Sequence, residues 1–214
     1  MAKQAEQTNH NESLRDWDAS YQKGKQALPW DTGVVAPELV AYLESRDMPK
    51  SVLEVGCGTG SNAIWMAERG ALVVATEIAP TAIELAKKKL ADTKKLQLEF
   101  RVADITKEKP VPDSSVDFVF DRGVFHVMPD DLSRAAFIER VAAALHIGGF
   151  WLCIAGSMDE ERPEGVGGPP QLTARNLVDA AEKHFEVFHL KRIISAGPYD
   201  SQIVMWEALY RKRA

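Results

Sequence analysis

The chain has 214 residues, of which 45% are hydrophobic and 27% are charged, a composition typical of one globular domain with a sizeable core. The formal net charge of −5 gives no electrostatic reason to expect nucleic acid as a partner. No apolar run is long enough to cross a bilayer, and the polar start of the chain lacks the apolar core of a signal peptide, so we expect a cytoplasmic protein.

The first expected unit is an N-terminal flap, residues 1–33, in which large aromatic side chains stand in a polar segment. We do not expect Trp17, Tyr21 and Trp30 all to be exposed to water, because their large aromatic side chains favour burial. They either anchor the flap on the main domain or cover a bound ligand, where aromatic faces attract a cation by about 0.5–2 kcal/mol. The residues alone leave both roles open. An amphipathic helix is expected next, over Val34–Arg46.

A glycine-rich turn between a strand and a helix is the central feature of the chain. The short apolar run Ser51–Val55, rich in β-branched residues, predicts a buried strand. Gly56, Gly58 and Gly60 follow at every second position and would let a ligand lie against bare backbone. The stretch Ser61–Arg69 predicts a helix whose free N–H groups, carrying roughly half a positive charge, point at that ligand. The pattern therefore predicts a nucleotide-binding strand, loop and helix.

The type of nucleotide follows from the spacing and from one acid. A dinucleotide fingerprint would need glycine at position 61, where the chain has Ser61, and the Gly-Lys-Ser/Thr ending of a P-loop does not occur. Glu54 stands two residues before the first glycine, where a carboxylate suits an ammonium group better than a pyrophosphate. We therefore expect a ligand that carries both a nucleoside and a positive charge.

The next two predicted strands each end in an acid that suits a nucleoside. Leu72–Thr76 predicts the second strand, and Glu77 at its end can accept both hydroxyl groups of a ribose, a surface glutamate being the alternative. The third strand alternates apolar and polar residues over Leu96–Val102 and leads into Asp104 and Ile105. The Asp104 carboxylate can accept a hydrogen bond from the adenine amino group while Ile105 packs on the ring.

The fourth predicted strand, Ser115–Phe120, leads to the residues that we expect at the reacting centre. Ligands of a doubly wound sheet bind beyond the carboxyl ends of the strands where the strand order reverses, and the first and fourth strands flank that point. Asp121 could contact the ligand or carry a proton, and His126 could take a proton or hold an anion as imidazolium. His126 could instead be hydrogen-bonded inside the wall, and Arg122 could attract an anionic substrate or pair with a neighbouring acid.

The rest of the chain continues the alternation of strands and helices. We interpret residues 156–171, a long loop with several glycines and prolines, as a cover on the substrate side, an insertion without function being the alternative. The other expected elements are a helix opened by Pro80, a helix over Pro129–Leu145 closed by Gly148 and Gly149, a strand over Phe150–Ala155, a helix over Thr173–Lys183, and an antiparallel hairpin of Phe185–Ser195 and Gln202–Tyr210 that turns at 196–201.

Two patterns resemble a known family. The run Leu53-Glu54-Val55-Gly56-Cys57-Gly58-Thr59-Gly60 resembles motif I of the class I S-adenosylmethionine (SAM) methyltransferases. A more particular resemblance, to the thiopurine, halide and thiol methyltransferases, rests on Trp17-Asp18-x-x-Tyr21-x-x-Gly24 and Pro29-Trp30-Asp31-x-Gly33. The chain departs from that family at Tyr21, where tryptophan is frequent, at Glu77, where aspartate is usual, and in a longer spacer before Pro29.

The resemblance implies an α/β, Rossmann-like, doubly wound sheet of seven strands in the order 3-2-1-4-5-7-6, with strand 7 antiparallel, as the domain of residues 34–214. It implies SAM as the cofactor and the flap as its cover. The implied cofactor-binding residues are Trp17, Tyr21, Trp30, Glu54, Gly56, Cys57, Gly58, Gly60, Glu77, Ile78, Asp104, Ile105 and Asp121. The catalytic candidates are Asp121, Arg122 and His126, and we expect no metal ion.

The function that this resemblance implies is methyl transfer from SAM to a small molecule. We expect an S-methyltransferase, because a thiol is partly ionised at neutral pH and needs no dedicated base. An O- or N-methyltransferase of a small metabolite and a SAM-binding protein without catalysis are the alternatives. The expected partner is a small-molecule methyl acceptor, with no nucleic acid and no membrane, and the expected state is a monomer or weak homodimer.

Overall fold

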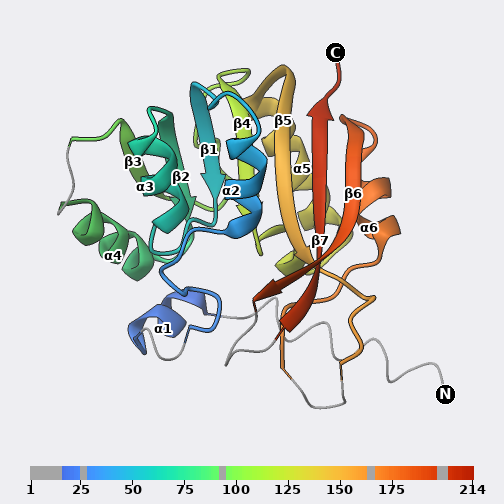
Figure 1. Ribbon diagram of the computed structural model, residues 1–214, viewed down its shortest axis with the longest axis horizontal. Coiled ribbons are helices and arrows are strands. Elements are labelled where there is room, and N and C mark those ends of the chain that lie inside the picture. The colour runs from blue at the N-terminus through green and yellow to red at the C-terminus, as the bar shows by residue number, and fades with distance from the viewer. Residues whose placement is uncertain (1–15, 25–27, 92–94, 163–166, 197–201) are drawn as a thin grey trace.

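The computed structural model describes residues 16–24, 28–91, 95–162, 167–196 and 202–214 (Figure 1). They form one sheet with the strand order β3-β2-β1-β4-β5-β7-β6. Strand β7 is antiparallel to its neighbours β5 and β6, and the other pairs are parallel. The expected fold class, strand order and antiparallel seventh strand are confirmed.

The element bounds agree closely with the sequence pattern over most of the chain. The strands are β1 (Ser51–Val55), β2 (Leu72–Glu77), β3 (Leu98–Val102), β4 (Val116–Arg122), β5 (Leu145–Gly156), β6 (Phe185–Ala196) and β7 (Gln202–Lys212). The helices are α1 (Trp17–Gln22), α2 (Pro37–Glu44), α3 (Ser61–Glu68), α4 (Pro80–Ala91), α5 (Asp131–Ala144) and α6 (Ala174–Ala181), with a short 3₁₀ helix η3 (Phe125–Val127). None of the helices in the described ranges is long and apolar enough to cross a membrane.

Residues at the first turn explain where three of these helices begin. Pro37 starts α2, where its missing N–H costs no hydrogen bond. The Asp130 side chain accepts the Ser133 N–H at 2.8 Å at the start of α5. Thr173 and Asn176 form a reciprocal capping box at the start of α6.

Helices cover both faces of the sheet, so the strands bury side chains on two sides. Helices α2, α3 and α4 pack on one face, and α5 and α6 pack on the other (Figure 1). On the first face, the Tyr42 ring stacks on Phe118 with 5.2 Å between centroids. On the second face, Trp151 stacks on Tyr210 with 4.7 Å between centroids.

One expected boundary is wrong, and two expectations fall outside the described residues. The helix expected over Pro129–Leu145 ends at Ala144, and β5 follows at once, so Gly148 and Gly149 lie in the strand instead of closing the helix. Gly149 is needed there because a Cβ would lie 2.9 Å from the Asp117 carbonyl oxygen, beside an irregularity in the β4–β5 register. The polar N-terminal residues and most of the expected 196–201 turn lie outside the described ranges.

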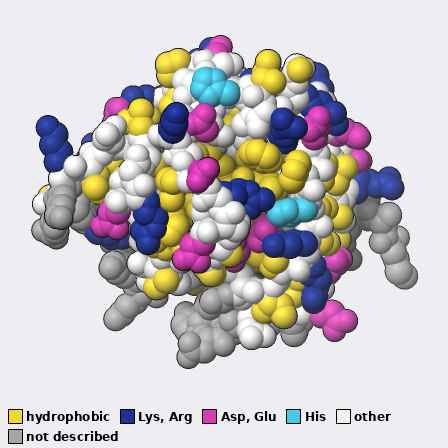
Figure 2. All heavy atoms as spheres, turned by 45° about the horizontal axis from the view of Figure 1, so that its top comes forward, with side chains coloured by type: hydrophobic (Ala, Val, Ile, Leu, Met, Phe, Trp, Pro, Cys, Tyr) yellow, Lys and Arg dark blue, Asp and Glu magenta, His cyan; other side chains and the backbone are white. Residues whose placement is uncertain are grey.

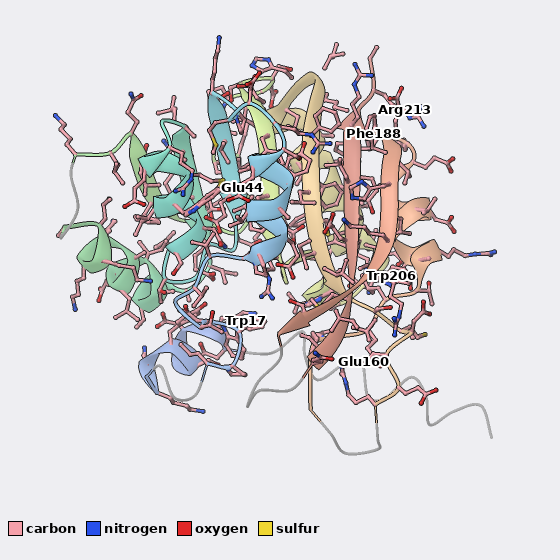
Figure 3. All side chains as sticks on the ribbon, in the orientation of Figure 1. Trp17, Glu44, Glu160, Phe188, Trp206 and Arg213 are labelled. Carbon is pink, nitrogen blue, oxygen red and sulfur yellow. The ribbon has the colours of Figure 1, made fainter. Side chains whose placement is uncertain are left out.

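The carboxyl ends of the parallel strands mark the end of the molecule that matters for function. Trp17 and Glu160 both lie beyond that end, and Arg213 lies at the opposite end (Figure 3). Side chains of both charges are interspersed over the face drawn in Figure 2, around a central group of hydrophobic side chains. The two parts of the chain that the sequence analysis placed over a ligand, the aromatic flap and the long loop, therefore meet the same end of the sheet.

Candidate active site

A cavity of about 240 Å³ lies beyond the carboxyl ends of β1, β2 and β4. The nucleoside side of its wall comes from the flap and from the ends of β1 to β3, and includes Trp17, Tyr21, Trp30, Gly56, Glu77, Ile78, Asp104 and Ile105. The other side comes from β4, η3, the long loop and β7, and includes Arg122, His126, Val127, Met128, Pro169, Pro170, Ile203 and Met205. This is the position where doubly wound sheets bind ligands.

Only the first glycine of the central loop reaches the cavity wall. Gly56 lines it, whereas Cys57, Gly58 and Gly60 do not. Gly60 has a φ of +80°, and a Cβ there would lie 2.6 Å from the Phe100 ring, so this glycine lets α3 pack closely on the sheet. Cys57 is buried, and burial raises the pKa of its thiol well above the usual value. The expected direct contacts of Cys57, Gly58 and Gly60 with a ligand are thus not supported by their positions.

Glu77 is held at the cavity wall by the backbone of two loops. Its Oε1 accepts the N–H groups of Ile78 at 2.7 Å and Ala79 at 3.1 Å, and its Oε2 accepts the N–H of Gly58 at 3.2 Å. Burial raises the pKa of this carboxyl, and the three N–H donors oppose that effect. The Ile78 side chain is half exposed beside it and lines the cavity. This part of the wall therefore combines a fixed carboxylate with an apolar surface.

Asp104 lines the cavity, but its carboxylate has partners in its own turn. Oδ1 accepts both the N–H and the hydroxyl of Thr106, at 3.0 and 2.6 Å, and Oδ2 pairs with Lys107 at 2.8 Å. Ile105 is buried beside it and lines the wall. The apolar wall expected from Ile105 is in place, while the Asp104 carboxylate is already engaged.

The three flap aromatics both anchor the segment and line the cavity. Trp17 and Trp30 meet edge to face with 5.6 Å between ring centroids, and Trp30 Nε1 donates to Tyr21 Oη at 3.3 Å. Tyr21 is only 4% exposed, and burial together with the nearby Glu77 raises its pKa. The flap is also tied to α4, because the N–H of Thr81 donates to Asp18 at 2.7 Å. The two roles that the sequence left open for these aromatics, anchoring the flap and covering a ligand, are therefore compatible with each other.

Glu54 lies behind the loop instead of in the cavity wall. It is 1% exposed; its Oε1 accepts from Asn62 Nδ2 at 3.0 Å, and its Oε2 has no hydrogen-bond partner among the described residues. Burial raises the pKa of Glu54 to about 8. Asp31, across the loop, accepts from the Thr59 hydroxyl at 3.0 Å with one oxygen, and its other oxygen likewise has no partner in the described ranges. Together with Glu77, these acids give the loop a negative potential when they are ionised, and a bound cation would favour the ionised form of Glu54.

The Asp121 side chain is turned away from the cavity, so its position does not support the predicted role in catalysis and cofactor binding. Its side chain is fully buried on the side of the sheet that carries α5, and it does not line the cavity. One oxygen accepts the N–H groups of Val124 and Phe125, at 3.1 and 3.0 Å, and the other accepts from Trp151 Nε1 at 3.1 Å. Burial raises the pKa of this carboxyl. Asp121 therefore fixes the turn between β4 and η3.

His126 lines the cavity, but neither expected proton role fits its surroundings. The backbone N–H of Gly156 donates to its Nδ1 at 2.7 Å, so the neutral ring carries its hydrogen on Nε2. Burial, followed by the charges of Arg122 and Arg162, lowers the pKa of His126 to about 3. These surroundings disfavour an imidazolium at neutral pH, and the nitrogen that could act as a base already accepts a hydrogen bond. What His126 can offer is an N–H donor.

Arg122 pairs with a buried acid that the sequence did not indicate. Its Nε lies 3.6 Å from Glu38 Oε2, its Nη2 donates to Ser195 Oγ at 3.0 Å, and Ser195 Oγ donates to Glu38 Oε1 at 2.6 Å. Glu38 comes from α2 and Ser195 from β6, so neither is near Arg122 in the sequence. Arg122 nevertheless lines the cavity. The pairing thus holds Arg122 in place while it faces a ligand.

The side of the cavity beyond Arg122 is apolar. Val127, Met128, Pro169 and Pro170 line it, with Ile203 and Met205 of β7. The expectation that the long loop covers this side agrees with the position of the two prolines. Among the described residues, no group of three or more His, Cys, Asp and Glu side chains is placed to hold a metal ion.

Comparison with known proteins gives consistent results. The methyltransferase domain family matches residues 52–149. A 2-heptyl-1-hydroxyquinolin-4(1H)-one methyltransferase of Mycobacteroides abscessus is 30% identical over 74% of this chain and 69% of its own length. A probable thiol methyltransferase of Arabidopsis thaliana is 29% identical over 72% of this chain and 65% of its own length.

A solved structure shows the same fold. The 1,6-didemethyltoxoflavin-N1-methyltransferase of Burkholderia thailandensis, solved with its substrate and S-adenosylhomocysteine, superposes with a TM-score of 0.70 at 18% identity. The superposition covers 100% of this chain and 92% of that one. At this identity the likeness concerns the fold, and the chemistry has to be argued from the cavity.

Proposed function

The chain belongs to the class I SAM-dependent methyltransferases, and from this premise we propose that it methylates a small, largely apolar acceptor that enters the cavity already ionised, a thiolate in the first instance. The observation that carries the proposal is the chemistry of the acceptor side. Of the described residues on this side, Arg122 and His126 have polar side chains that can donate hydrogen bonds, and the others are apolar.

SAM is the cofactor, and the nucleoside side of the cavity fits it. Glu77 presents a carboxylate held by three backbone N–H groups, which suits the two hydroxyls of a ribose. Ile78 and Ile105 give an apolar surface for a base. The carboxylate oxygens of Glu54 and Asp31 that have no partner among the described residues lie beside the glycine loop, where a cationic ligand would compensate them.

The flap supplies the remaining surface for a cation. Trp17, Tyr21 and Trp30 line the cavity, and an aromatic face attracts a cation by about 0.5–2 kcal/mol. When bound, SAM supplies a methyl group on a positively charged sulfur, and the neutral thioether that remains is a good leaving group. Because the acceptor is already an anion, the transfer leaves no proton for the protein to remove. The chain's own task is to align the acceptor and exclude water.

Within the described ranges, no side chain on the acceptor side is a suitable base, which favours an acceptor of low pKa. His126 has its Nδ1 occupied by a backbone N–H, and Asp121 is buried with both oxygens engaged. Glu77 and Asp104 belong to the nucleoside side. An alkyl thiol, with a pKa of about 8.5, is partly ionised at neutral pH, and Arg122 and the His126 N–H would stabilise its anion. The similarity to a probable thiol methyltransferase supports this reading.

An acidic hydroxyl on a planar ring is the second candidate acceptor. The relative from Mycobacteroides abscessus is named for a hydroxyquinolone that carries a heptyl chain, a molecule with one polar edge and a long apolar part. The acceptor side of this chain has the same character, with two donors at one place and Met128, Ile203 and Met205 around them. Such a hydroxyl also ionises without a strong base.

An acceptor panel with methyl-labelled SAM tests the proposal. Alkyl thiols, an aromatic thiol, a 1-hydroxyquinolone and an amine are each incubated with the protein, and label in each product is counted. Label in the thiols supports the first candidate, and label in the hydroxyquinolone alone supports the second. Label in the amine alone, or tight cofactor binding with no transfer to any acceptor, contradicts the proposal. Arg122→Met serves as the site control, because loss of its charge should raise the KM of anionic acceptors and leave SAM binding unchanged.

A further inference from the structure

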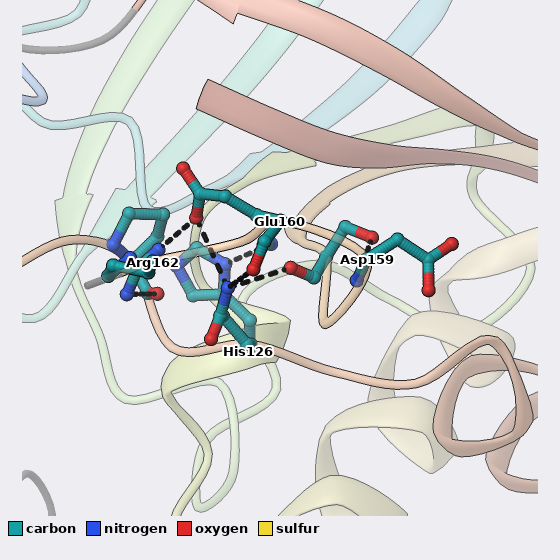
Figure 4. A network of polar contacts seen from close by, with 8 residues as sticks. His126, Asp159, Glu160 and Arg162 are labelled. Carbon is teal, nitrogen blue, oxygen red and sulfur yellow. Dashed lines mark hydrogen bonds and ion pairs between the residues drawn. The ribbon is translucent and has the colours of Figure 1, made fainter. Parts of the chain in front are cut away.

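The loop between β5 and α6 is tied together by a group of side chains that the mechanism above does not use. Arg162 and Glu160 form an ion pair, with side chains only 16% and 12% exposed (Figure 4). Gln171 Nε2 donates to the carbonyl oxygens of Ser157 at 3.1 Å and Glu160 at 3.0 Å, and to Glu160 Oε2 at 3.2 Å. We call Glu160, Arg162 and Gln171 the loop clasp.

The loop clasp acts directly on the two prolines of the acceptor wall. Arg162 Nη1 donates to the carbonyl oxygen of Pro169 at 2.9 Å, and Pro169 and Pro170 line the cavity. A Cβ at Gly168 would collide with the Arg162 guanidinium, so the glycine permits this close approach. The backbone of Pro169 is therefore held by a partly buried charge pair that does not itself line the cavity.

The base of the loop is fixed to the sheet and to His126. The N–H of Leu172 donates to the Gly156 carbonyl oxygen at 2.9 Å, and the N–H of Met158 donates to the Leu172 carbonyl oxygen at 2.9 Å. Trp206 Nε1 also donates to that Leu172 oxygen, at 2.8 Å. The N–H of Gly156 is the donor that holds His126 Nδ1. The described part of the loop is thus continuous with the acceptor side of the cavity.

We infer that the loop clasp determines which acceptors the cavity binds well, by holding Pro169 and Pro170 as a fixed apolar wall. This inference rests on the proposed function and specifies its acceptor class: molecules with a ring or chain long enough to reach the prolines. A small thiol that occupies only the space beside Arg122 gains nothing from this wall. Arg162 and Glu160 are positioning residues, because Arg162 contacts the wall, Glu160 contacts Arg162, and neither lines the cavity.

The test compares a bulky and a small acceptor in matched variants. KM and kcat are measured for an aromatic thiol and for a small alkyl thiol in wild type, Arg162→Gln and Glu160→Gln. The KM for the aromatic thiol should rise about tenfold, the size expected for losing one hydrogen bond from a charged donor. Its kcat and the KM of the small thiol should stay within about twofold. Glu161→Gln is the control, because Glu161 is exposed, lies in the same loop and is outside the clasp.

Two further measurements decide the inference, and the second of them does not depend on turnover. In the double variant Glu160→Gln/Arg162→Gln the KM for the aromatic thiol should be no higher than in Arg162→Gln, since the two residues act through one ion pair. By NMR, the amide protons of Met158 and Leu172 should exchange faster in Arg162→Gln than in wild type or Glu161→Gln. Unchanged exchange, or equal changes in KM for both thiols, overturns the inference. A wild type that methylates no thiol or hydroxyl acceptor instead refutes the proposed function, and the exchange rates still decide whether the clasp orders the loop.

Discussion

Replacing Glu54 by glutamine should stabilise the protein without cofactor and weaken SAM binding. Glu54 is 1% exposed, and only one of its oxygens has a hydrogen-bond partner among the described residues, the Asn62 amide at 3.0 Å. Glutamine has the same shape and keeps an oxygen for Asn62, so the substitution removes the buried charge and little else. A buried carboxylate that serves to bind a cationic ligand is expected to destabilise the fold when that ligand is absent.

The size of the effect follows from the pKa of Glu54, which burial raises from 4.5 to about 8. Because the folded protein binds this proton more tightly than the unfolded chain, the contribution to stability is complete below about pH 4.5 and is lost as the pH rises to about 8. At about 1.4 kcal/mol for each pH unit, the ionised carboxylate costs about 5 kcal/mol at pH 9 as an upper limit. Glu54→Gln should recover most of this amount at pH 9 and nothing at pH 4.5.

Urea unfolding at the two pH values measures the effect, with Glu44→Gln as the control because Glu44 is an exposed glutamate at the end of α2. The difference between Glu54→Gln and wild type should be close to zero at low pH and several kcal/mol in favour of the variant at pH 9. Calorimetry at pH 9, where Glu54 is ionised, should show a Kd for SAM about tenfold higher in the variant, corresponding to a loss of roughly 1.4 kcal/mol. A variant that is less stable than wild type at pH 9, or a difference independent of pH, would refute the reasoning.

The remaining predictions concern the cavity and the loop beneath it. Steady-state kinetics of His126→Gln should show kcat within about tenfold of wild type, because a donor is altered and no general base is lost; a fall of about 10²–10⁴-fold would mean that His126 is the base. Trp30→Ala should raise the Kd of SAM, measured by calorimetry, by about 2- to 30-fold. The Kd of S-adenosylhomocysteine, whose sulfur is uncharged, should rise by less. An equal rise in both Kd values would argue against attraction of the cation. Gly60→Ala should destabilise the protein by about 1–3 kcal/mol in thermal unfolding, since its Cβ would lie 2.6 Å from the Phe100 ring; an unchanged Tm would contradict that packing role.

Much of the fold could be predicted because its signals are local. The apolar run Ser51–Val55 and the glycines after it identify β1 and the start of α3 from adjacent residues alone. The same kind of local argument placed Glu77 at the end of β2, where the structure has it. The prediction for Gly148 and Gly149 was wrong because a glycine pair after a helix resembles a helix end. In the structure the pair lies in β5, where that strand approaches β4 closely.

The chemistry of the site was harder to predict because it depends on partners distant in the sequence. Asp121 reads as a catalytic acid until Trp151, on the neighbouring strand, is seen to use its second oxygen. His126 reads as a base until the backbone of Gly156 is seen to occupy its Nδ1. Arg122 finds Glu38 only because the fold brings α2 beside the end of β4. For Asp121 and His126, burial and a long-range contact reverse what the residue type suggests, whereas for Arg122 the contact fixes a residue that still lines the cavity.

The loop clasp could not be read from the sequence either, although one signal was present. Two adjacent prolines, Pro169 and Pro170, indicate a stiff segment near the substrate side. Nothing in the local pattern says that Arg162 would hold them through a carbonyl oxygen. Such a contact within an irregular loop has no periodicity that would reveal it.

The pH dependence of kcat/KM across a series of thiols tests the central claim most directly. Thiols of different pKa are assayed at saturating SAM, and the midpoint of each pH profile is compared with the pKa of the thiol in solution. If the acceptor enters the cavity as an anion and the protein supplies donors only, each midpoint should follow the pKa of its thiol. One midpoint shared by all of the thiols would contradict the account, because it would belong to a base on the protein.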